Sequence, residues 1–421
     1  MDNTYKISDI IDSYISGDWG NDCKTDETPY PVYCVRGADI VPLSNSQFND
    51  IPLRYISLRS LQTRCLREGD IIIEKSGGSP TQSTGRVVYV SKELLSVKKH
   101  IVCSNFCTAI RIKEDWNALY VFLYLQNVYN SGVFFNFEGK TSGLKNLMID
   151  AAFKSIPMKE ITMTEQSAIA ASISTIDKKR SLNRQINDNL EAMARQLYDY
   201  WFVQFDFPNE KGKPYKSSGG DMVWNEKLKR EIPQGWSNGI LSDVANITMG
   251  QSPDGSSYNE VGEGSIFYQG STDFGLRFPT IRQYTTSPNR YANRGDILMS
   301  VRAPVGALNI ANNDCCIGRG LSALSSKIGS MTHLYYLMND FRLKFEGMNS
   351  AGTTFGSITK DELFNLPVVI PTKSVISEFE KVCEPIFDKQ MIIGEEINAL
   401  TKQRDELLPL LMSGQVSVNS D

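Results

Sequence analysis

The sequence predicts a mixed α+β fold: two α/β domains and two long helices that form an antiparallel coiled coil, related by a pseudo-two-fold internal repeat. Two observations support this prediction. Short motifs of the first half of the chain recur in the same order in the second half, and each half ends in a long segment with helical apolar spacing. The 421 residues also suffice for about three domains of ordinary size.

The repeat is visible in several short matches. Ser8–Ile10 recurs as Ser242–Val244, and Gly69–Ile71 recurs as Gly295–Ile297. One such match is at the level of chance, but matches that keep their order while loop lengths change indicate a tandem duplication. The remaining matches are Ile156–Pro157 with Leu366–Pro367, Asp177–Lys178 with Asp388–Lys389, and Ile186–Asn187 with Ile397–Asn398.

Each domain is expected to mix strands, helices and large loops. In the first domain, the apolar run at residues 70–73 predicts a strand, residues 74–85 predict a Gly/Ser/Thr-rich loop, and residues 119–128 predict a helix. The second domain repeats this order, with a strand, a loop and a helix expected at residues 296–299, 302–306 and 333–342.

Each long helix has a start signal and an apolar stripe. Thr164 and Ser374 are expected to cap the helices, and Glu165 and Glu378 place a negative charge in the first turn. Pro385 should kink or restart the second helix. The stripe steps by three and four residues, which predicts that the two helices pair with each other in antiparallel fashion. The expected interface residues are Ile169, Ile173, Ile176, Ile186, Leu190, Met193, Leu197, Phe379, Ile386, Ile393, Ile397, Leu400 and Leu407.

These elements predict six segments. The stretch between the two copies is rich in Lys, Gly, Asn and Pro, which is typical of a surface connector. The expected boundaries are a first domain at residues 1–160, a long helix at 161–206, the connector at 207–233, a second domain at 234–371, a second long helix at 372–413 and a tail at 414–421.

The chain carries little that suggests catalysis or metal binding. Eight cysteines contain no CxxC spacing, and only His100 and His333 are available as imidazoles, neither in a nucleophile motif. The Gly139–Thr141 segment resembles the end of a P-loop, but Phe134 stands where the loop requires glycine. The motif (N/D)PP(Y/F) of amino-methyltransferases is missing too. We therefore expect no catalytic residue, no metal and no cofactor on this chain.

Hydropathy indicates the compartment. No apolar run is long enough for a membrane span, and the first residues lack the basic and apolar regions of a secretory signal. The sequence therefore predicts a soluble cytoplasmic protein without membrane contact.

Charge is segregated although the net charge is only −4. Residues 51–113 contain 11 basic and 4 acidic residues, residues 274–320 contain six arginines and two aspartates, and residues 1–50 are acidic. A solvated charged face would explain one basic patch, but two patches at equivalent places in two repeats favour DNA binding. The candidate DNA-binding residues are Arg54, Arg59, Arg64, Lys75, Arg86, Lys98, Lys99, Arg277, Arg282, Arg290, Arg294, Arg302 and Arg319.

Four segments resemble a known protein family. They are Tyr200–Pro208, Gly212–Gly220, Ile232–Trp236 and Leu407–Val416. The first three resemble the central region of type I restriction–modification specificity subunits, and the last resembles the C-terminus of that family. The resemblance extends to the order of domain, helix, domain and helix along the whole chain.

The resemblance implies a non-catalytic subunit with two target-recognition domains. Such a subunit would bind double-stranded DNA at a bipartite target, dock two modification (methyltransferase) subunits through its long helices, and be joined by restriction (motor-nuclease) subunits. S-adenosylmethionine, ATP and Mg²⁺ would be bound by those partners. Because the two domains differ throughout their loops, we expect two different half-sites and an asymmetric target.

Two alternatives remain at this level. The chain could carry its own methyltransferase or nuclease activity besides reading DNA, although the missing motifs argue against this. It could also be a coiled-coil scaffold that binds only proteins, which would leave the paired basic patches unexplained. Tests of the purified chain for methyl transfer and for sequence-specific DNA binding would separate the three possibilities.

Overall fold

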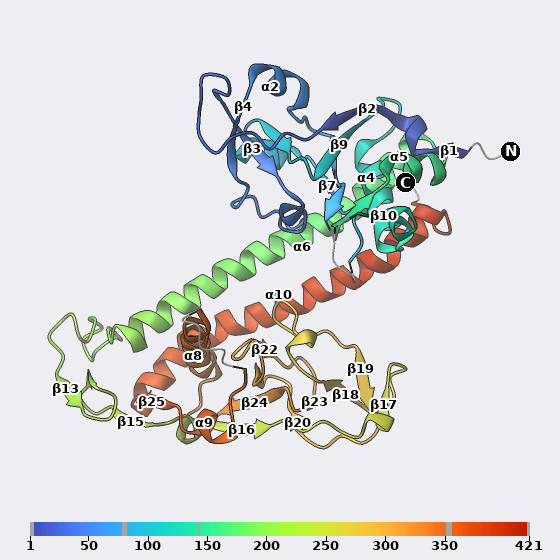
Figure 1. Ribbon diagram of the computed structural model, residues 1–421. Helices are drawn as coiled ribbons and strands as arrows, with labels where there is room; N and C mark the ends of the chain where they lie inside the picture. Colours follow the sequence, from blue (N-terminus) through green and yellow to red (C-terminus); the bar gives the residue numbers. More distant parts are fainter. Residues whose placement is uncertain (1–3, 78–81, 142–143, 351–355, 419–421) are drawn as a thin grey trace. The chain divides into compact units, whose positions relative to one another are not determined.

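The computed structural model describes residues 4–77, 82–141, 144–350 and 356–418 (Figure 1). The chain divides into two compact units. The first contains Met1–Leu182 and Asn398–Asp421, and the second contains Asn183–Ile397. Each unit therefore combines one α/β domain with a part of each long helix.

The first unit contains a four-stranded antiparallel sheet and smaller sheets beside it. The four strands lie in the order β2 (Ile11–Ser16), β9 (Cys107–Ile112), β5 (Ile71–Glu74) and β7 (Val87–Tyr89). The smaller sheets are β4 (Leu53–Ile56), β3 (Tyr30–Val35) and β8 (Ile101–Cys103); β1 (Thr4–Lys6) with β12 (Pro157–Lys159); and β10 (Glu138–Thr141), β11 (Leu144–Leu147) and β6 (Ser76–Gly77). The helices are η1 (Ile7–Ile10), η2 (Gly37–Asp39), α1 (Ile40–Ser44), α2 (Leu58–Arg64), α3 (Lys92–Val97), α4 (Ala118–Asn130), η3 (Val133–Phe137) and α5 (Ile149–Ser155).

The second unit repeats the order of the four-stranded sheet, and its second sheet is larger than that of the first unit. Its four-stranded sheet has the order β16 (Ala245–Met249), β24 (Leu321–Ser326), β21 (Ile297–Ser300) and β22 (Leu308–Ile310). Its second sheet has five strands: β17 (Tyr258–Asn259), β19 (Gln283–Thr285), β18 (Ser265–Tyr268), β23 (Cys315–Ile317) and β20 (Tyr291–Ala292). Two-stranded sheets pair β15 (Ser237–Ile240) with β25 (Pro367–Ile370) and β13 (Met222–Asn225) with β14 (Arg230–Pro233). The helices are α7 (Leu241–Val244), η5 (Gly255–Ser257), η6 (Ser271–Asp273), α8 (Met331–Ser350) and α9 (Lys360–Phe364).

The recurring motifs perform the same local task in both copies. The carboxylate of Asp9 accepts a hydrogen bond of 2.8 Å from the backbone N–H of Lys6, and the carboxylate of Asp243 accepts one of 2.8 Å from Ile240. Each aspartate thereby satisfies a free N–H at the start of a short helix. The Gly-Asp motif is equally repeated, because Gly69 has a φ of +91° and Gly295, its counterpart, a φ of +94°.

The core of the first unit joins the sheet, α4 and the long helices. Ile71, Ile110 and Val121 are fully buried there, and Ile173 and Leu408 of the long helices lie in the same hydrophobic cluster. Apolar side chains of the long helices thus belong to the core of the domain. Each Å² of apolar surface that is buried stabilises the folded state by about 25 cal/mol, so this shared core stabilises the first unit.

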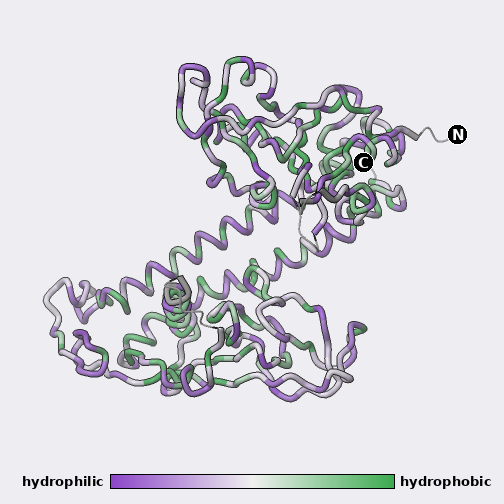
Figure 2. The backbone as a smooth tube through the Cα atoms, viewed as in Figure 1, coloured by the Kyte–Doolittle hydropathy of each residue, from purple (hydrophilic) through white to green (hydrophobic). Residues whose placement is uncertain are grey.

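The long helices are α6 (Met163–Tyr198), which continues into the π-helical turn η4 (Asp199–Val203), and α10 (Lys373–Ser413). Hydrophilic and hydrophobic residues alternate along both (Figure 2). The expected cap at Thr164 is wrong, because Thr162 and Glu165 form a capping box. The backbone N–H of Thr162 donates to the Glu165 carboxylate over 2.9 Å, and the backbone N–H of Glu165 donates to the Thr162 hydroxyl over 3.2 Å. Ser374 lies inside α10 rather than at its cap, and α10 runs through Pro385 without a restart.

The two helices pair antiparallel in both units. In the first unit, Arg404 Nε lies 3.2 Å from Asp177 Oδ1, and Arg180 donates to Thr401 over 3.0 Å. In the second unit, the same direction follows from two further bonds: Asn183 donates to Glu396 over 2.8 Å and Gln390 donates to Glu191 over 2.9 Å. These polar contacts fix the register of the pair.

The expected apolar interface is placed unevenly. Ile169, Ile173, Phe379, Ile393 and Ile397 are buried, and a second group is half-buried, namely Ile176, Leu190, Leu197, Ile386, Leu400 and Leu407. Ile186 and Met193 are 37% and 52% exposed, contrary to the expectation. The physical reason is that other side chains take the inward positions of α6. Asn183 and Asn187 turn inward, so Ile186 between them faces solvent, and Met193 faces solvent beside the buried Ala194.

The 207–233 segment is folded rather than a plain surface connector. It contains the β13–β14 hairpin, and Phe207 is 5% exposed. The Phe207 ring stacks on Tyr215 with centroids 4.6 Å apart and on Trp236 at 5.1 Å. Phe207 and Tyr215 of this segment therefore belong to the second unit's core, whereas Trp224 is exposed.

His333 lies near the start of α8, as expected, and its ring is buried. It packs edge-on against Phe202 with centroids 4.5 Å apart. Burial lowers the pKa of His333 to about 3. The unfolded chain, with a pKa of about 6.5, therefore takes up the proton first as the pH falls.

We expect His333 to make the protein acid-sensitive. The stability it contributes is complete above about pH 6.5 and decreases as the pH falls toward about 3, by about 2 kcal/mol between pH 7 and pH 5. His333→Phe should lack this part of the pH dependence. Urea denaturation of both proteins at the two pH values measures it, and equal pH dependence would contradict the assignment.

Candidate nucleic-acid interface

The same edge of the sheets carries exposed basic side chains in both domains. We define the loop edge of the first domain as Gly17–Asp18, Lys75–Ser76 and Ser104–Phe106, and that of the second as Gly250–Ser252, Val301–Arg302 and Gly318–Gly320. These segments directly follow β2, β5 and β8, or their counterparts β16, β21 and β23. The two loop edges are therefore equivalent places in the repeat.

A close turn fixes the centre of each loop edge. In the first domain, Cys107 N–H donates to Ser104 O over 2.9 Å, and Lys75 N–H donates to Phe106 O over 2.8 Å. A Cβ on Gly17 would lie 1.9 Å from Ser104 O, so β2 approaches the turn as only glycine allows. The β8–β9 turn is thus held by backbone contacts on two sides.

The second domain repeats these contacts. Leu321 N–H donates to Gly318 O over 3.0 Å, and Val301 N–H donates to Gly320 O over 2.9 Å. A Cβ on Gly250 would lie 2.2 Å from Gly318 O. The β23–β24 turn has the same construction as the β8–β9 turn.

Six of the candidate DNA-binding residues are exposed and have no side-chain hydrogen bond or ion pair within the described part of the chain. Lys75 lies at the first loop edge, and Arg302 and Arg319 lie at the second. Arg290 is close to the second edge, since its carbonyl accepts from Ile317 N–H over 2.9 Å. The six are Arg59, Lys75, Lys99, Arg290, Arg302 and Arg319.

The other candidates already have partners. Arg54 is 6% exposed and is paired with Asp22, and Arg64 lies 3.5 Å from Asp18. These pairs use acidic residues of the first 50 positions, so part of the segregated charge is neutralised within the domain. Partners of the others are Asp273 for Arg282 at 2.6 Å, Glu395 for Arg294 at 2.7 Å, and the Tyr33 ring for Lys98 at 4.5 Å.

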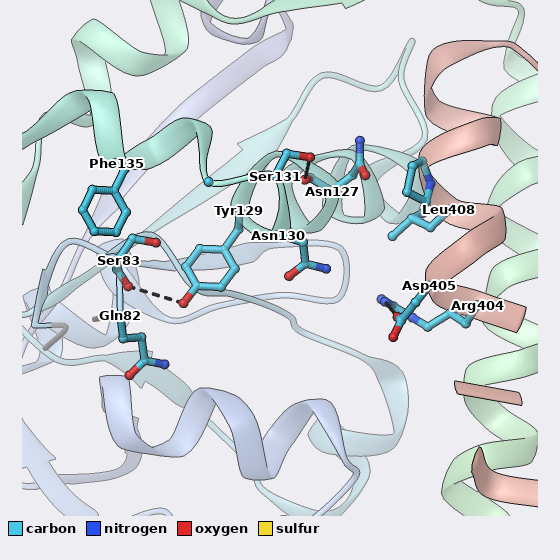
Figure 3. Close-up of a pocket in the computed structure, with 12 residues that line it drawn as sticks. Gln82, Ser83, Asn127, Tyr129, Asn130, Ser131, Phe135, Arg404, Asp405 and Leu408 are labelled. Atoms are coloured by element: carbon cyan, nitrogen blue, oxygen red, sulfur yellow. Dashed lines mark hydrogen bonds and ion pairs between the residues drawn. The ribbon is translucent and has the colours of Figure 1, made fainter. Parts of the chain in front are cut away.

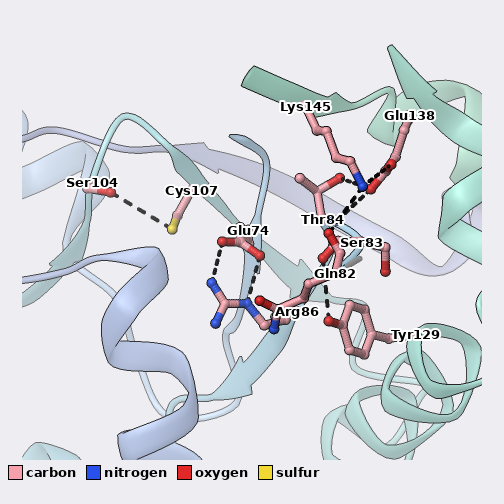
Figure 4. A network of polar contacts seen from close by, with 10 residues as sticks. All are labelled: Glu74, Gln82, Ser83, Thr84, Arg86, Ser104, Cys107, Tyr129, Glu138 and Lys145. Carbon is pink, nitrogen blue, oxygen red and sulfur yellow. Dashed lines mark hydrogen bonds and ion pairs between the residues drawn. The ribbon is translucent and has the colours of Figure 1, made fainter. Parts of the chain in front are cut away.

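Arg86 and Arg277, two further candidates, are held within the domains by acidic partners. Arg86 Nε donates to the buried Glu74 carboxylate over 2.8 Å, and its Nη2 donates to the other oxygen over 2.5 Å (Figure 4). Arg277 is 7% exposed, lies 3.6 Å from Glu191 and stacks over the Phe387 ring at 4.9 Å. Basic residue type alone could not reveal these acidic partners, of which Glu74 is buried and Glu191 half-buried.

A second polar network holds the loop that precedes β7. Thr84 N–H donates to Glu138 Oε1 over 2.7 Å, and Lys145 forms an ion pair of 3.2 Å with Glu138 (Figure 4). Lys145 also donates to Gln82 O over 3.2 Å. The described end of the Gly/Ser/Thr-rich loop is therefore fixed to β10 and β11.

Two cavities lie beside the domains. The first, of about 750 Å³, is lined by Gln82, Tyr129 and Asn130 of the domain and by Arg404 and Asp405 of α10 (Figure 3). A second cavity of about 840 Å³ in the other unit is lined by equivalent elements, α8 and α6. The first mixes basic, acidic and amide groups and lacks the mostly apolar lining that is typical of a small-molecule site. The second combines apolar side chains, such as Val305, Leu308 and Leu343, with charged ones, such as Glu191 and Arg342.

The chemistry of catalysis and metal binding is not assembled in the described residues. No group of three or more His, Cys, Asp or Glu side chains there could hold a metal ion. Burial raises the pKa of Cys34, Cys107, Cys315 and Cys383 to about 12, so these thiols stay protonated and unreactive. None of the helices formed by the described residues is long and apolar enough to cross a membrane.

Sequence reasoning missed Asn105 and Phe106. Both side chains are exposed on the β8–β9 turn, Phe106 by 56%. A search for basic residues passes over them. Alignment of Ser104–Cys107 with Gly318–Leu321 as equivalent turns of the repeat would have found them.

Comparisons with known proteins agree with the duplicated fold. The model of the type I restriction modification DNA specificity domain matches residues 3–192 and 233–404. The MjaX specificity subunit of Methanocaldococcus jannaschii, by name a type I restriction enzyme component, is 31% identical over 310 residues, covering 72% of this chain and 69% of that protein. The HindI specificity subunit of Haemophilus influenzae is 22% identical over 417 residues, covering 84% and 88%.

A solved structure supports the fold. The S subunit of a type I restriction–modification system from M. genitalium has a TM-score of 0.58 and 15% identity, covering 100% of this chain and 96% of that chain. The predicted fold class of two mixed domains and a coiled-coil pair is thereby confirmed. The chain belongs to the type I restriction–modification DNA specificity family and is a non-catalytic specificity subunit.

Proposed function

We propose that this subunit reads an asymmetric bipartite DNA target with the loop edges of its two recognition domains, residues 1–160 and 234–371. In this proposal, α6 and α10 dock two methyltransferase subunits, and restriction subunits join the complex for cleavage. S-adenosylmethionine, ATP and Mg²⁺ then belong to those partners.

The observation that carries the proposal is the equivalence of the two loop edges. Each presents cationic side chains that have no partner among the described residues, Lys75 in one and Arg302 with Arg319 in the other. Such side chains bind phosphates or the edges of bases in the major groove. A protein with two equivalent DNA-binding edges suits a target with two separate half-sites.

The differences between the domains support two different half-sites. The second sheet has three strands in the first domain and five in the second. Near the first loop edge, Asp18 and Arg64 compensate each other's charge at 3.5 Å, whereas the two arginines of the second edge form no ion pair in the described part of the chain. The chemistry offered to DNA therefore differs between the domains.

Exposed apolar side chains on the long helices support docking of partner proteins. Leu182 and Met193 of α6 are 55% and 52% exposed, and Ile392 of α10 is 59% exposed. A partner protein that packs along the helices would bury these apolar side chains, which would favour the complex.

Arg302→Ala should relax base preference in one half-site only. A bidentate contact to a base contributes about 1–3 kcal/mol of discrimination, and Arg302 lies on one domain. Selection of bound sequences from a randomised DNA library by the subunit with its methyltransferase partners measures this preference. Arg294→Ala is the matched control, because Arg294 is held by Glu395.

The outcomes of this experiment are distinct. A uniform loss of affinity for all sequences would make Arg302 a phosphate contact. Unchanged affinity and preference would make it a bystander. The alternative function, a specificity subunit-like chain with its own methyltransferase or nuclease activity, requires methyl transfer or cleavage by the purified chain alone, and we expect neither.

A further inference from the structure

The first residue of the central turn differs between the two loop edges. Asn105 holds this position in the β8–β9 turn, and Arg319 holds it in the β23–β24 turn. The assignment follows from the backbone bonds, because Ser104 N–H donates to Val35 O over 2.9 Å and Gly318 N–H donates to Tyr268 O over 2.8 Å. The residues after Ser104 and Gly318 are therefore structurally equivalent.

Both side chains are available to a ligand. Asn105 and Arg319 are exposed, and neither side chain has a hydrogen bond or ion pair among the described residues. Their backbones, in contrast, are fixed, since the carbonyl groups of Ser104 and Gly318 pack against Gly17 and Gly250 at distances that exclude a Cβ. A fixed backbone limits the entropy lost when the side chain binds.

The two side chains differ in the base that each recognises. The side-chain amide of asparagine forms two hydrogen bonds with adenine: its oxygen accepts from the N6 amino group, and its NH₂ group donates to N7. The guanidinium of arginine donates to both O6 and N7 of guanine. Each forms a bidentate pair with one purine and leaves the other purine imperfectly matched.

We infer that this turn position selects one base in each half-site: Asn105 selects an adenine in the half-site of the first domain, and Arg319 selects a guanine in that of the second. The inference rests on the proposed function, because it needs both loop edges to contact DNA. It adds one residue-to-base assignment for each domain.

The neighbouring residues agree with this role. Lys75 donates its backbone N–H to the β8–β9 turn and keeps its ammonium group exposed. Val301 makes the same backbone contact to the β23–β24 turn, and the exposed Arg302 directly follows it. A cation beside each turn can bind the phosphate that places the base edge opposite the turn. Phe106, which follows Asn105, also points its ring to solvent and adds apolar surface at the same place.

Exchange of the two side chains tests the inference. Asn105→Arg should change the preferred base at one position of the first half-site from adenine to guanine, and Arg319→Asn should make the opposite change in the second half-site. Each change should amount to about 5- to 150-fold, the discrimination of one bidentate pair. The readout is selection of bound sequences from a randomised library by the full subunit with its methyltransferase partners.

Asn136→Arg is the matched control for the added charge. Asn136 is exposed on η3 of the same domain and lies outside the three segments that define the loop edge. This variant should therefore raise the general affinity for DNA without changing any base preference. If both exchange variants changed the affinity for DNA but not the base preference, the inference would be overturned. A bipartite target of the wild-type protein would in that case still support the proposed function. A wild-type selection without two half-sites would overturn both.

Discussion

Replacing Arg86 by alanine is expected to lower the free energy of unfolding by about 3–5 kcal/mol, the cost of leaving one member of a buried ion pair without its partner. Glu74 is 2% exposed and accepts both of its ion-pair hydrogen bonds from Arg86. A Cβ on Gly37 or Gly77 would lie within 3 Å of the Glu74 carboxylate, which leaves little room for compensating water. Urea denaturation of the full chain measures the effect.

A double variant separates the ion pair from the packing. Glu74→Leu with Arg86→Leu removes both charges, so it should recover most of the lost stability. Arg59→Ala, at an exposed arginine of the same domain, should leave stability within about 0.5 kcal/mol of the wild type. An Arg86→Ala protein with wild-type stability but weaker DNA binding would show instead that Arg86 contacts DNA.

Insertion of one heptad into both long helices is expected to lengthen the preferred spacer between the half-sites by about three base pairs. One heptad adds about 10.5 Å of helix at a rise of about 1.5 Å per residue, and a base pair occupies about 3.4 Å of DNA. Inserted after Asn187 and after Asn398, seven residues keep the repeat of the helix pair. The prediction rests on the hypothesis that α6 and α10, which connect the two recognition domains along the chain, set the gap between the half-sites.

The spacer measurement uses DNA targets that differ only in the number of base pairs between the half-sites. Both half-site sequences should remain those of the wild type. Because the inserted heptads also change the rotation between the domains, a shift of about two to four base pairs fits the hypothesis. An unchanged optimum would show that the domains themselves, and not α6 and α10, determine the gap.

Local sequence signals predicted the repeat and its strands because their physical causes are local. Asp9 and Asp243 accept from an N–H only three residues away, and the glycine of the Gly-Asp motif is needed for its own positive φ. Such contacts depend on neighbours in sequence, so a short motif contains all the information. The strands expected at residues 70–73 and 296–299 were predictable because each is a short apolar run that directly follows the Gly-Asp turn, and they lie at Ile71–Glu74 and Ile297–Ser300.

The role of each arginine was not predictable, since it depends on residues far away in sequence. Arg54 is paired with Asp22, and Arg277 lies beside Glu191, and nothing within either local sequence indicates that partner. The helix pair shows the same limit. The apolar stripe predicted an interface, but the hydrogen bond between Asn183 and Glu396 could be located only once both helices were placed.

The most direct test of the bipartite reading is to map the methylated adenines in DNA from cells that contain this subunit and its modification partners. The account predicts two different short sequences separated by a gap of fixed length and random sequence, one for each recognition domain. A palindromic target, or a continuous one without a gap, would contradict it.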